Sequence, residues 1–172
     1  MRTHLVFGCA VLSVWLLGGL LVSAQDTHDK AHAELAKALP SAKVSLVEGL
    51  AASAREGTPI SGKFELEEGK LQLSFYTMKG DTFSEVIVDH MTGQVAKVEP
   101  ITGGGDLTAA TAQRAAMTRA KKSLQTVVDA AVKAHAGMRA VSVFPELKGE
   151  QAVAEITLGK NGAFMTVSEP LE

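Results

Sequence analysis

The sequence predicts an α+β protein in which helices pack on antiparallel sheet, and three observations support this prediction. An amphipathic helical pattern is followed by segments of alternating apolar and polar residues, and this order occurs twice along the chain. Short turn sequences containing glycine separate the alternating segments, which favours antiparallel connections between neighbouring strands. Each helix and each sheet then has one apolar face, and laying the helix on the sheet buries both faces. We therefore expect two helix-on-antiparallel-sheet units with extra Ala-rich helices.

The N-terminal segment of this 172-residue chain has the pattern of an export signal. Arg2 precedes a charge-free, largely apolar run over residues 5–22, and Val22-Ser23-Ala24 supplies the small residues that signal peptidase prefers. We expect residues 1–24 to be a signal peptide that is cleaved on export to the periplasm or the exterior. Retention of the run as a membrane anchor is the alternative, and the sequence leaves it open. Cleavage removes Cys9, the only cysteine, so no disulfide framework is expected.

The rest of the chain contains an internal repeat. A shift of 78 positions places Ser45-Leu46 on Ser123-Leu124, and a shift of 81 positions places Phe83 on Phe164. This repeat predicts a helical segment over residues 25–42 and a first unit over residues 43–101. A Gly-rich joint and connecting helix over residues 102–121 then lead to a second unit over residues 122–172.

Both units begin with a predicted helix. Ser45 and Glu48 form a capping box in the first unit, and Ser123 caps the helix of the second unit. We expect these helices to end at Gly57 and Gly137. Two Ala-rich helices precede them, over residues 29–39 and 107–122, and the second is expected to run directly into its unit.

Alternating patterns predict the strands. The segments in the first unit are residues 63–67, 71–76, 83–88 and 94–99, and those in the second are 140–144, 152–158 and 163–168. The first unit thus has four predicted strands and the second unit has three. We expect a sheet of the same strand order in each unit.

The segment Val88-Asp89-His90-Met91-Thr92-Gly93-Gln94-Val95 resembles the strand–turn–strand ending of the PepSY domain. The helix start at Ser45-Leu46, Gly62 and Glu85-Val86 also fit this family, and residues 43–99 match it better than residues 122–168. The resemblance implies an extracytoplasmic, cystatin-like helix-on-sheet module. Such modules occur in propeptides of thermolysin-like metallopeptidases, and inhibition or chaperoning of peptidases has been proposed for them.

The turn motif has a structural explanation. An Asp that opens a turn accepts hydrogen bonds from amides two and three residues ahead, and Gly93 supplies the positive φ before the next strand. We therefore interpret Asp89, Thr92 and Gly93 as a structural motif. The common signatures of hydrolases, zinc peptidases and P-loop nucleotide-binding proteins are missing from the sequence, so we expect no catalytic residue and no cofactor.

Two histidines form the one metal candidate in the sequence. His28 and His32 are four residues apart and share a helix face, a spacing that can bind a divalent ion. The sequence offers no third ligand near them. Nucleic-acid binding is not expected, because the net charge is −2 and one Tyr is present for stacking.

The missing fourth strand of the second unit predicts a binding site. With no counterpart of residues 94–99, the last strand is left with an open edge at Ala163, Phe164, Met165, Thr166, Val167 and Ser168. We expect this edge to receive an extended segment from a polypeptide partner or from a second copy of the chain. Coverage by the C-terminal tail or by an Ala-rich helix is the competing expectation.

Three functions are consistent with these features. The first hypothesis is a non-catalytic extracytoplasmic binding module that engages a polypeptide, for example a peptidase, and regulates it in trans. The alternatives are a metal-handling accessory protein that uses His28 and His32, and a structural protein of the cell envelope. After cleavage of the signal we expect no membrane association, and homo-oligomer formation stays open.

Overall fold

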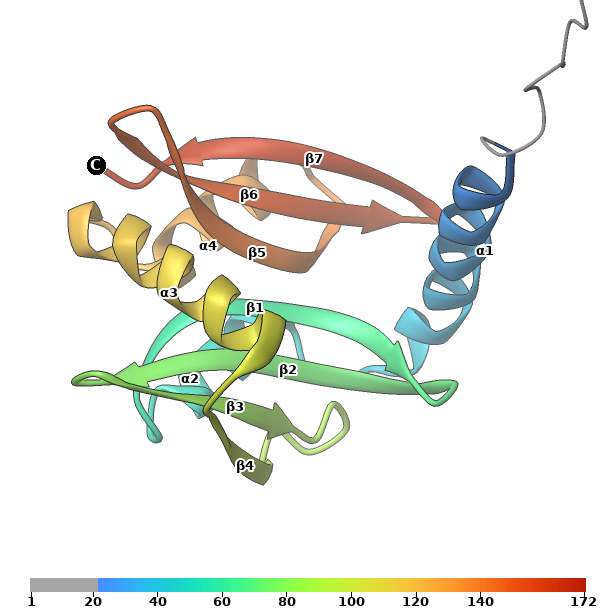
Figure 1. Ribbon diagram of the computed structural model, residues 1–172. Helices are drawn as coiled ribbons and strands as arrows, with labels where there is room; N and C mark the ends of the chain where they lie inside the picture. The colour runs from blue at the N-terminus through green and yellow to red at the C-terminus, as the bar shows by residue number, and fades with distance from the viewer. Residues whose placement is uncertain (1–21) are drawn as a thin grey trace, which may run out of the picture.

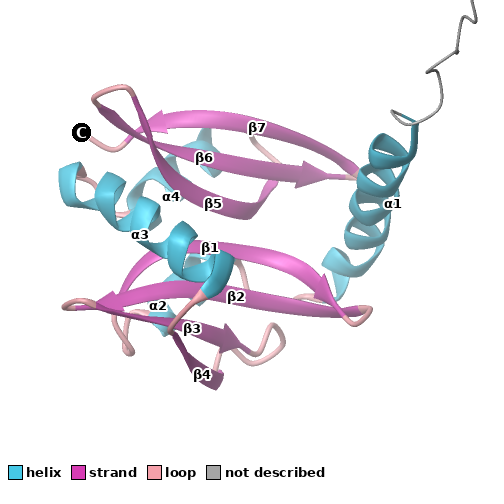
Figure 2. Ribbon diagram, viewed as in Figure 1, coloured by secondary structure: helices cyan, strands magenta, loops and turns pink. Residues whose placement is uncertain are grey.

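A computed structural model describes the backbone from residue 22 and the side chains from residue 30 to the C-terminus, so most of the expected signal peptide lies outside the described residues. Helices and strands are mixed, which confirms the predicted α+β class (Figures 1 and 2). The helices are α1 (Val22–Ala38), the short 3-10 helix η1 (Leu39–Ser41), α2 (Leu46–Ser53), α3 (Gly104–Arg119) and α4 (Leu124–Ala134). The strands are β1 (Thr58–Glu67), β2 (Lys70–Lys79), β3 (Thr82–Val88), β4 (Val95–Ile101), β5 (Arg139–Lys148), β6 (Gln151–Lys160) and β7 (Ala163–Pro170).

All seven strands belong to one antiparallel sheet with the order β4-β3-β2-β1-β5-β6-β7. We expected a separate sheet in each unit, and this expectation was wrong. The two meanders join where β1 pairs with β5, at Gly62 opposite Val143 and Lys63 opposite Ser142. Pairing the first strands of the two meanders removes an exposed edge from each, which is the physical reason for the joint sheet.

Corresponding backbone features in the two halves of the sheet recur 81 residues apart. Strands β5 and β6 begin and end 81 residues after β1 and β2. The bulge between Pro59 and Ser61 recurs between Ala140 and Ser142. The halves of the sheet are therefore equivalent in backbone geometry as well as in strand order.

The connections before α2 and α4 are equivalent as well. The amides of Lys43 and Val44 both donate to the carbonyl of His90, at 2.9 and 3.0 Å. The amides of Lys121 and Lys122 donate in the same way to the carbonyl of Leu171, at 2.7 and 2.9 Å. His90 follows β3 and Leu171 follows β7, so each half ties its helix start to the end of its third strand.

Helices α2 and α4 pack side by side against one face of the sheet, while α3 crosses the other face (Figure 1). The predicted caps are confirmed. The Ser45 hydroxyl accepts from the Glu48 amide while the Glu48 carboxylate accepts from the Ser45 amide, and the Ser123 hydroxyl accepts from the Thr126 amide. These caps satisfy amides that the first turn of each helix leaves free.

Phe75 is the largest fully buried side chain on the α2 face. Its ring fills the space between Gly49 of α2 and Gly62 of β1, where an added Cβ would lie 2.4 and 2.5 Å from ring atoms. The equivalent positions in the second half carry Ile156 beside Val143. One half therefore pairs a large side chain with glycine and the other pairs two medium ones, which fills a similar volume in different ways.

The helix ends differ from the sequence-based expectation. Helix α2 ends at Ser53 and α4 at Ala134, a few residues before Gly57 and Gly137. Gly57 has no positive φ; a Cβ there would lie 2.8 Å from the Met78 carbonyl oxygen, so close approach to β2 is what requires glycine. Helix α3 is also separate from α4, because the chain becomes extended at Ala120 before the Ser123 cap.

Candidate polypeptide-binding edge

The outer side of β7 is one of the two edges of the sheet. Strand β7 pairs with β6 along its whole length, and no other strand among the described residues lies beside it. In the first half, the equivalent strand β3 pairs on that side with β4. The position that β4 occupies beside β3 thus has no counterpart beside β7.

The hydrogen-bond alternation of an antiparallel ladder shows which amides of β7 face outward. The Leu171 amide donates to the Ala152 carbonyl at 2.9 Å, so odd-numbered residues of β7 face β6. Phe164, Thr166 and Ser168 consequently direct their amide and carbonyl groups away from the sheet. In the first half, the Asp89 amide donates to the Gln94 carbonyl at 2.8 Å, so odd-numbered residues of β3 face β4. These include the equivalent residues Phe83, Glu85 and Ile87.

Tertiary contacts close the C-terminal end of this edge. The Pro170 carbonyl accepts from the Lys122 ammonium at 3.0 Å, and proline has no amide to donate. The Leu171 carbonyl is taken by the α3–α4 connection, as described above. The part of the edge that stays open is therefore residues 163–168, which we call the β7 edge. The C-terminal tail does not cover this edge, because Glu169 and Pro170 continue β7 and Leu171 pairs with Ala152.

Two cavities adjoin the β7 edge on the sheet face that carries α3. One has a volume of about 360 Å³ and lies between α1 and the strands, with Phe144, Thr157, Met165 and Thr166 in its wall. Met165 is 39% exposed and Phe144 37% exposed, so apolar side chains line its mouth. Phe164 separates this cavity from the second one.

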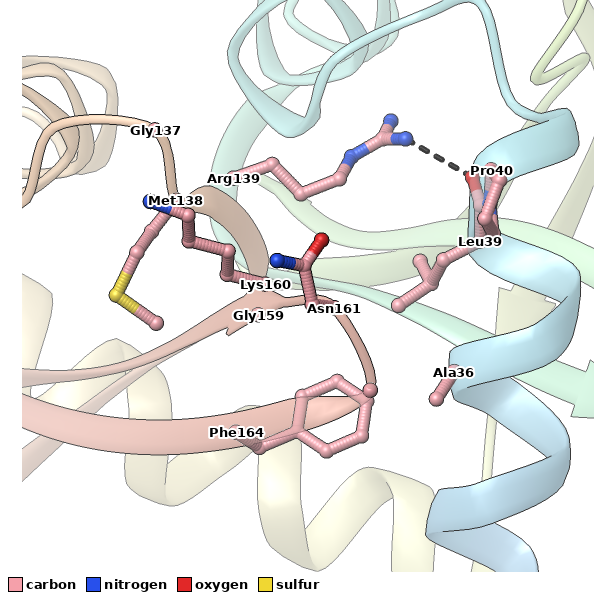
Figure 3. A pocket seen from close by; sticks show the side chains of 11 residues that line it. Ala36, Leu39, Pro40, Gly137, Met138, Arg139, Gly159, Lys160, Asn161 and Phe164 are labelled. Atoms are coloured by element: carbon pink, nitrogen blue, oxygen red, sulfur yellow. Dashed lines mark hydrogen bonds between the residues drawn. The ribbon is translucent and has the colours of Figure 1, made fainter.

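The second cavity, of about 550 Å³, lies between the end of α1 and the β6–β7 hairpin (Figure 3). Ala36, Leu39, Met138 and Phe164 give it apolar walls, and no acidic residue lines it. Phe164 stands opposite Gly159, on the face of the sheet that Ile156 does not share, and is half-buried.

Arg139 is fixed at the wall of this second cavity. Its guanidinium donates to the carbonyl of Leu39 at 2.9 Å (Figure 3). It also donates to the carbonyl of Val44 at 3.1 Å, and its Cζ lies 5.1 Å from the centre of the Phe64 ring. Partial burial lowers the pKa of Arg139, but a guanidinium stays charged at physiological pH. Arg139 therefore braces the segment between α1 and α2 and positions one wall of the cavity.

Only one of the two histidines in the metal hypothesis has a described side chain. His28 lies outside the residues whose side chains are described. His32 is exposed on α1 and meets the ring of Phe164 edge-on, with the ring centroids 5.3 Å apart. No group of three or more metal-binding side chains occurs from residue 30 onward. The metal site stays a prediction.

The turn after β3 has the predicted structure. Asp89 Oδ1 accepts from the amides of Met91 at 2.7 Å and Thr92 at 2.9 Å, and Gly93 has a φ of 75°. The two amides lower the pKa of Asp89 because they stabilise its carboxylate. These contacts account for the motif as a structural element of the turn.

Comparisons with family models, curated proteins and solved structures find no match to this chain. Within residues 22–172, no helix is both long enough and apolar enough to cross a membrane.

Proposed function

We propose that this chain is a non-catalytic, extracytoplasmic binding module of the PepSY type, with two cystatin-like units, that captures an extended polypeptide segment on the β7 edge. The observation that carries the proposal is the open edge at the position that β4 fills in the other half. The PepSY-like segment around Asp89 and the export-signal pattern at the N-terminus support the class and the compartment.

The first half illustrates the kind of occupant that the edge would take. Strand β4 is an extended segment of seven residues, and it pairs with β3 through the positions equivalent to Phe164, Thr166 and Ser168. A partner segment of similar length would meet the same ladder of donors and acceptors on β7. Main-chain pairing of this kind supplies affinity with little dependence on sequence.

The cavities beside the edge would supply selectivity. Alternate side chains of an added strand point to the face that carries α3, where Phe144 and Phe164 contribute apolar side chains to the cavity walls. Partner segments with an apolar residue at these alternate positions would bind best. A peptidase, or an unfolded chain that a peptidase acts on, can present such a segment, so regulation of a peptidase in trans is the function we propose.

The test uses a variant that removes one outward amide and leaves the fold intact. Proline at position 166 deletes the outward N–H without touching the pairing with β6, since proline is tolerated at such edge positions. The matched control is Thr166→Val, which keeps the amide and changes only the side chain.

Binding of a reduced and alkylated, permanently unfolded protein is measured by fluorescence anisotropy. We expect wild type and Thr166→Val to bind alike and Thr166→Pro to bind roughly tenfold more weakly, because one main-chain hydrogen bond is lost. Absence of binding by the wild type, or equal binding by Thr166→Pro, would refute the proposal. Sedimentation velocity over a range of concentrations identifies the other occupant, a second copy of the chain.

A further inference from the structure

A polar recess lies on the α3 face of the first half, well separated in the sheet from β7. It has a volume of about 380 Å³, and strands β1 to β4 and the first turn of α3 form it. Five carboxylates line the recess, whereas only two lysines do, so its lining carries an excess of negative charge. The carboxylates are those of Glu65, Glu67, Glu85, Glu99 and Asp106.

The two lysines are already paired. Lys63 forms an ion pair with Glu65, and Lys97 forms one with Glu99 at 2.7 Å. Glu67, Glu85 and Asp106 form no ion pair among the described residues, so three unpaired carboxylates line the recess. Two of these three, Glu85 and Asp106, lie next to the one tyrosine of the recess.

Glu85 and Asp106 lie on either side of Tyr76. Tyr76 stands opposite Glu85 in the pairing of β2 with β3, and its hydroxyl donates to Asp106 Oδ1 at 2.7 Å. Burial and the bond to Asp106 raise the pKa of Tyr76, so the phenol keeps its proton and remains a donor. Burial, followed by the neighbouring charge of Glu65, also raises the pKa of Glu85. A cation placed here would relieve the unfavourable burial of the Glu85 charge.

A second observation comes from a smaller cavity that adjoins the recess. It has a volume of about 160 Å³, shares Lys63 and Tyr76 with the recess, and is lined by Gln113 of α3. Gln113 is 8% exposed, and its Oε1 is buried without a hydrogen-bond partner. A buried carbonyl oxygen without a donor is costly, so a group that brings an N–H to this position would be favoured.

We propose that the recess and its inner cavity bind an organic cation, an ammonium or guanidinium group on a slim aliphatic chain, between Glu85, Asp106 and Gln113. The carboxylates match its charge, Gln113 Oε1 accepts from one of its N–H groups, and the apolar wall formed by Ala109 and Phe144 packs on its aliphatic chain. A metal ion fits less well, because the acidic side chains of the described residues nowhere form a group that could hold one. This proposal does not depend on the β7 edge.

Two sources can supply this chemistry, namely a free amine and the side chain of a polypeptide. Agmatine and spermidine represent the free amine, and an acetylated, amidated Gly-Arg-Gly peptide represents the side chain. The same peptide with citrulline in place of arginine keeps the shape and removes the charge. Each probe is titrated into the folded protein by calorimetry at low ionic strength.

Two variants test the assigned residues. Glu85→Gln removes the charge at nearly constant shape, and Gln113→Met removes the acceptor. Glu150→Gln, an exposed glutamate in the β5–β6 hairpin outside the recess, is the matched control. Circular dichroism verifies that each variant is folded before titration.

We expect at least one of the three cationic probes to bind the wild type. The same probe should bind roughly tenfold more weakly to Glu85→Gln and several-fold more weakly to Gln113→Met, and its affinity for Glu150→Gln should be unchanged. Binding of the arginine peptide alone would assign the recess to a polypeptide side chain, and binding of agmatine or spermidine to a free amine. Either result supports the site. Absence of binding by every cationic probe, equal binding of the citrulline peptide, or affinities unchanged in both recess variants would overturn it.

Discussion

The two halves of the sheet have the same strand geometry and differ in what covers their third strand. In the first half, β4 pairs with β3, and Phe83 is buried under α3 with the Arg114 guanidinium 5.3 Å from its ring centre. In the second half, β7 has no outer partner strand among the described residues, and Phe164 is only half-buried beside α1. The third strand is therefore covered in the first half and uncovered in the second.

The difference between β3 and β7 shows that a strand can belong to a stable sheet and still be available to bind a partner. The core of each half lies on the α2 and α4 face, and residues at equivalent positions fill it completely in both halves. Although no fourth strand covers β7 among the described residues, Ile156 and Leu158 on this face of the second half are fully buried.

Replacing Phe75 by Ala should destabilise the protein most. Phe75 is 0% exposed and packs between Gly49 and Gly62, so the change leaves a large cavity. We expect a loss of about 3–5 kcal/mol in the free energy of unfolding. Urea denaturation measures it, and Met91→Ala, an exposed turn residue, is the control. A midpoint unchanged from wild type would show that Phe75 does not anchor the core.

Proline substitutions at equivalent positions should destabilise the covered strand β3 more than the open strand β7. Glu85→Pro removes an amide that faces β4, so we expect a cost of about 1–3 kcal/mol from the unpaired partner groups. Thr166→Pro removes an amide that faces no strand, and its cost should be smaller. Thermal denaturation of the two variants measures the difference. Equal destabilisation would mean that the β7 edge is covered after all.

Substitutions at Gly62 and Phe75, the positions equivalent to Val143 and Ile156, test whether the two halves fill their cores in equivalent ways. Gly62→Ala alone should cost about 1–3 kcal/mol, because the added Cβ would lie 2.5 Å from the Phe75 ring. In the Phe75→Ile background, which copies Ile156, the same change should cost less. A double-mutant cycle by urea denaturation measures this coupling. If the losses in the free energy of unfolding were additive, the side-chain volumes at positions 62 and 75 would not compensate for each other, which would contradict this account.

The smallest expected effect concerns pH. The pKa of Glu85 is raised in the folded protein above its ordinary value of 4.5, so folding favours its protonated form. Stability contributed by this proton is present below the unfolded pKa and is lost as pH rises through the folded pKa. Glu85→Gln should therefore be slightly more stable than wild type at neutral pH, by less than about 1 kcal/mol, and not at pH 3. A gain that persists at pH 3 would point to another cause.

The sequence predicted the parts of this fold that local chemistry determines. The capping box at Ser45 and the Asp89 turn follow from short-range patterns, and the structure confirms both of them. The three strands of the second half were predicted as well, from their alternating patterns, and the described residues form β5, β6 and β7 there.

The long-range features could not be predicted in the same way. Pairing of β1 with β5 involves two residue pairs, and nothing in the sequence pattern around Gly62 indicates that the two meanders join there. The acidic recess combines residues of four strands and α3, so no single sequence window contains it. Gln113 belongs to an Ala-rich helix, and its burial became evident only from the packing of α3 on the sheet.

Amide hydrogen exchange followed by NMR tests the central claim most directly, because it compares equivalent amides of the two halves in one sample. We predict fast exchange at Phe164, Thr166 and Ser168 and slow exchange at Phe83, Glu85 and Ile87 in the free monomer. Addition of the unfolded polypeptide should slow exchange at the first three amides and leave the other three unchanged. Equally slow exchange at both sets in the free monomer would show that the β7 edge is closed, and would contradict the account.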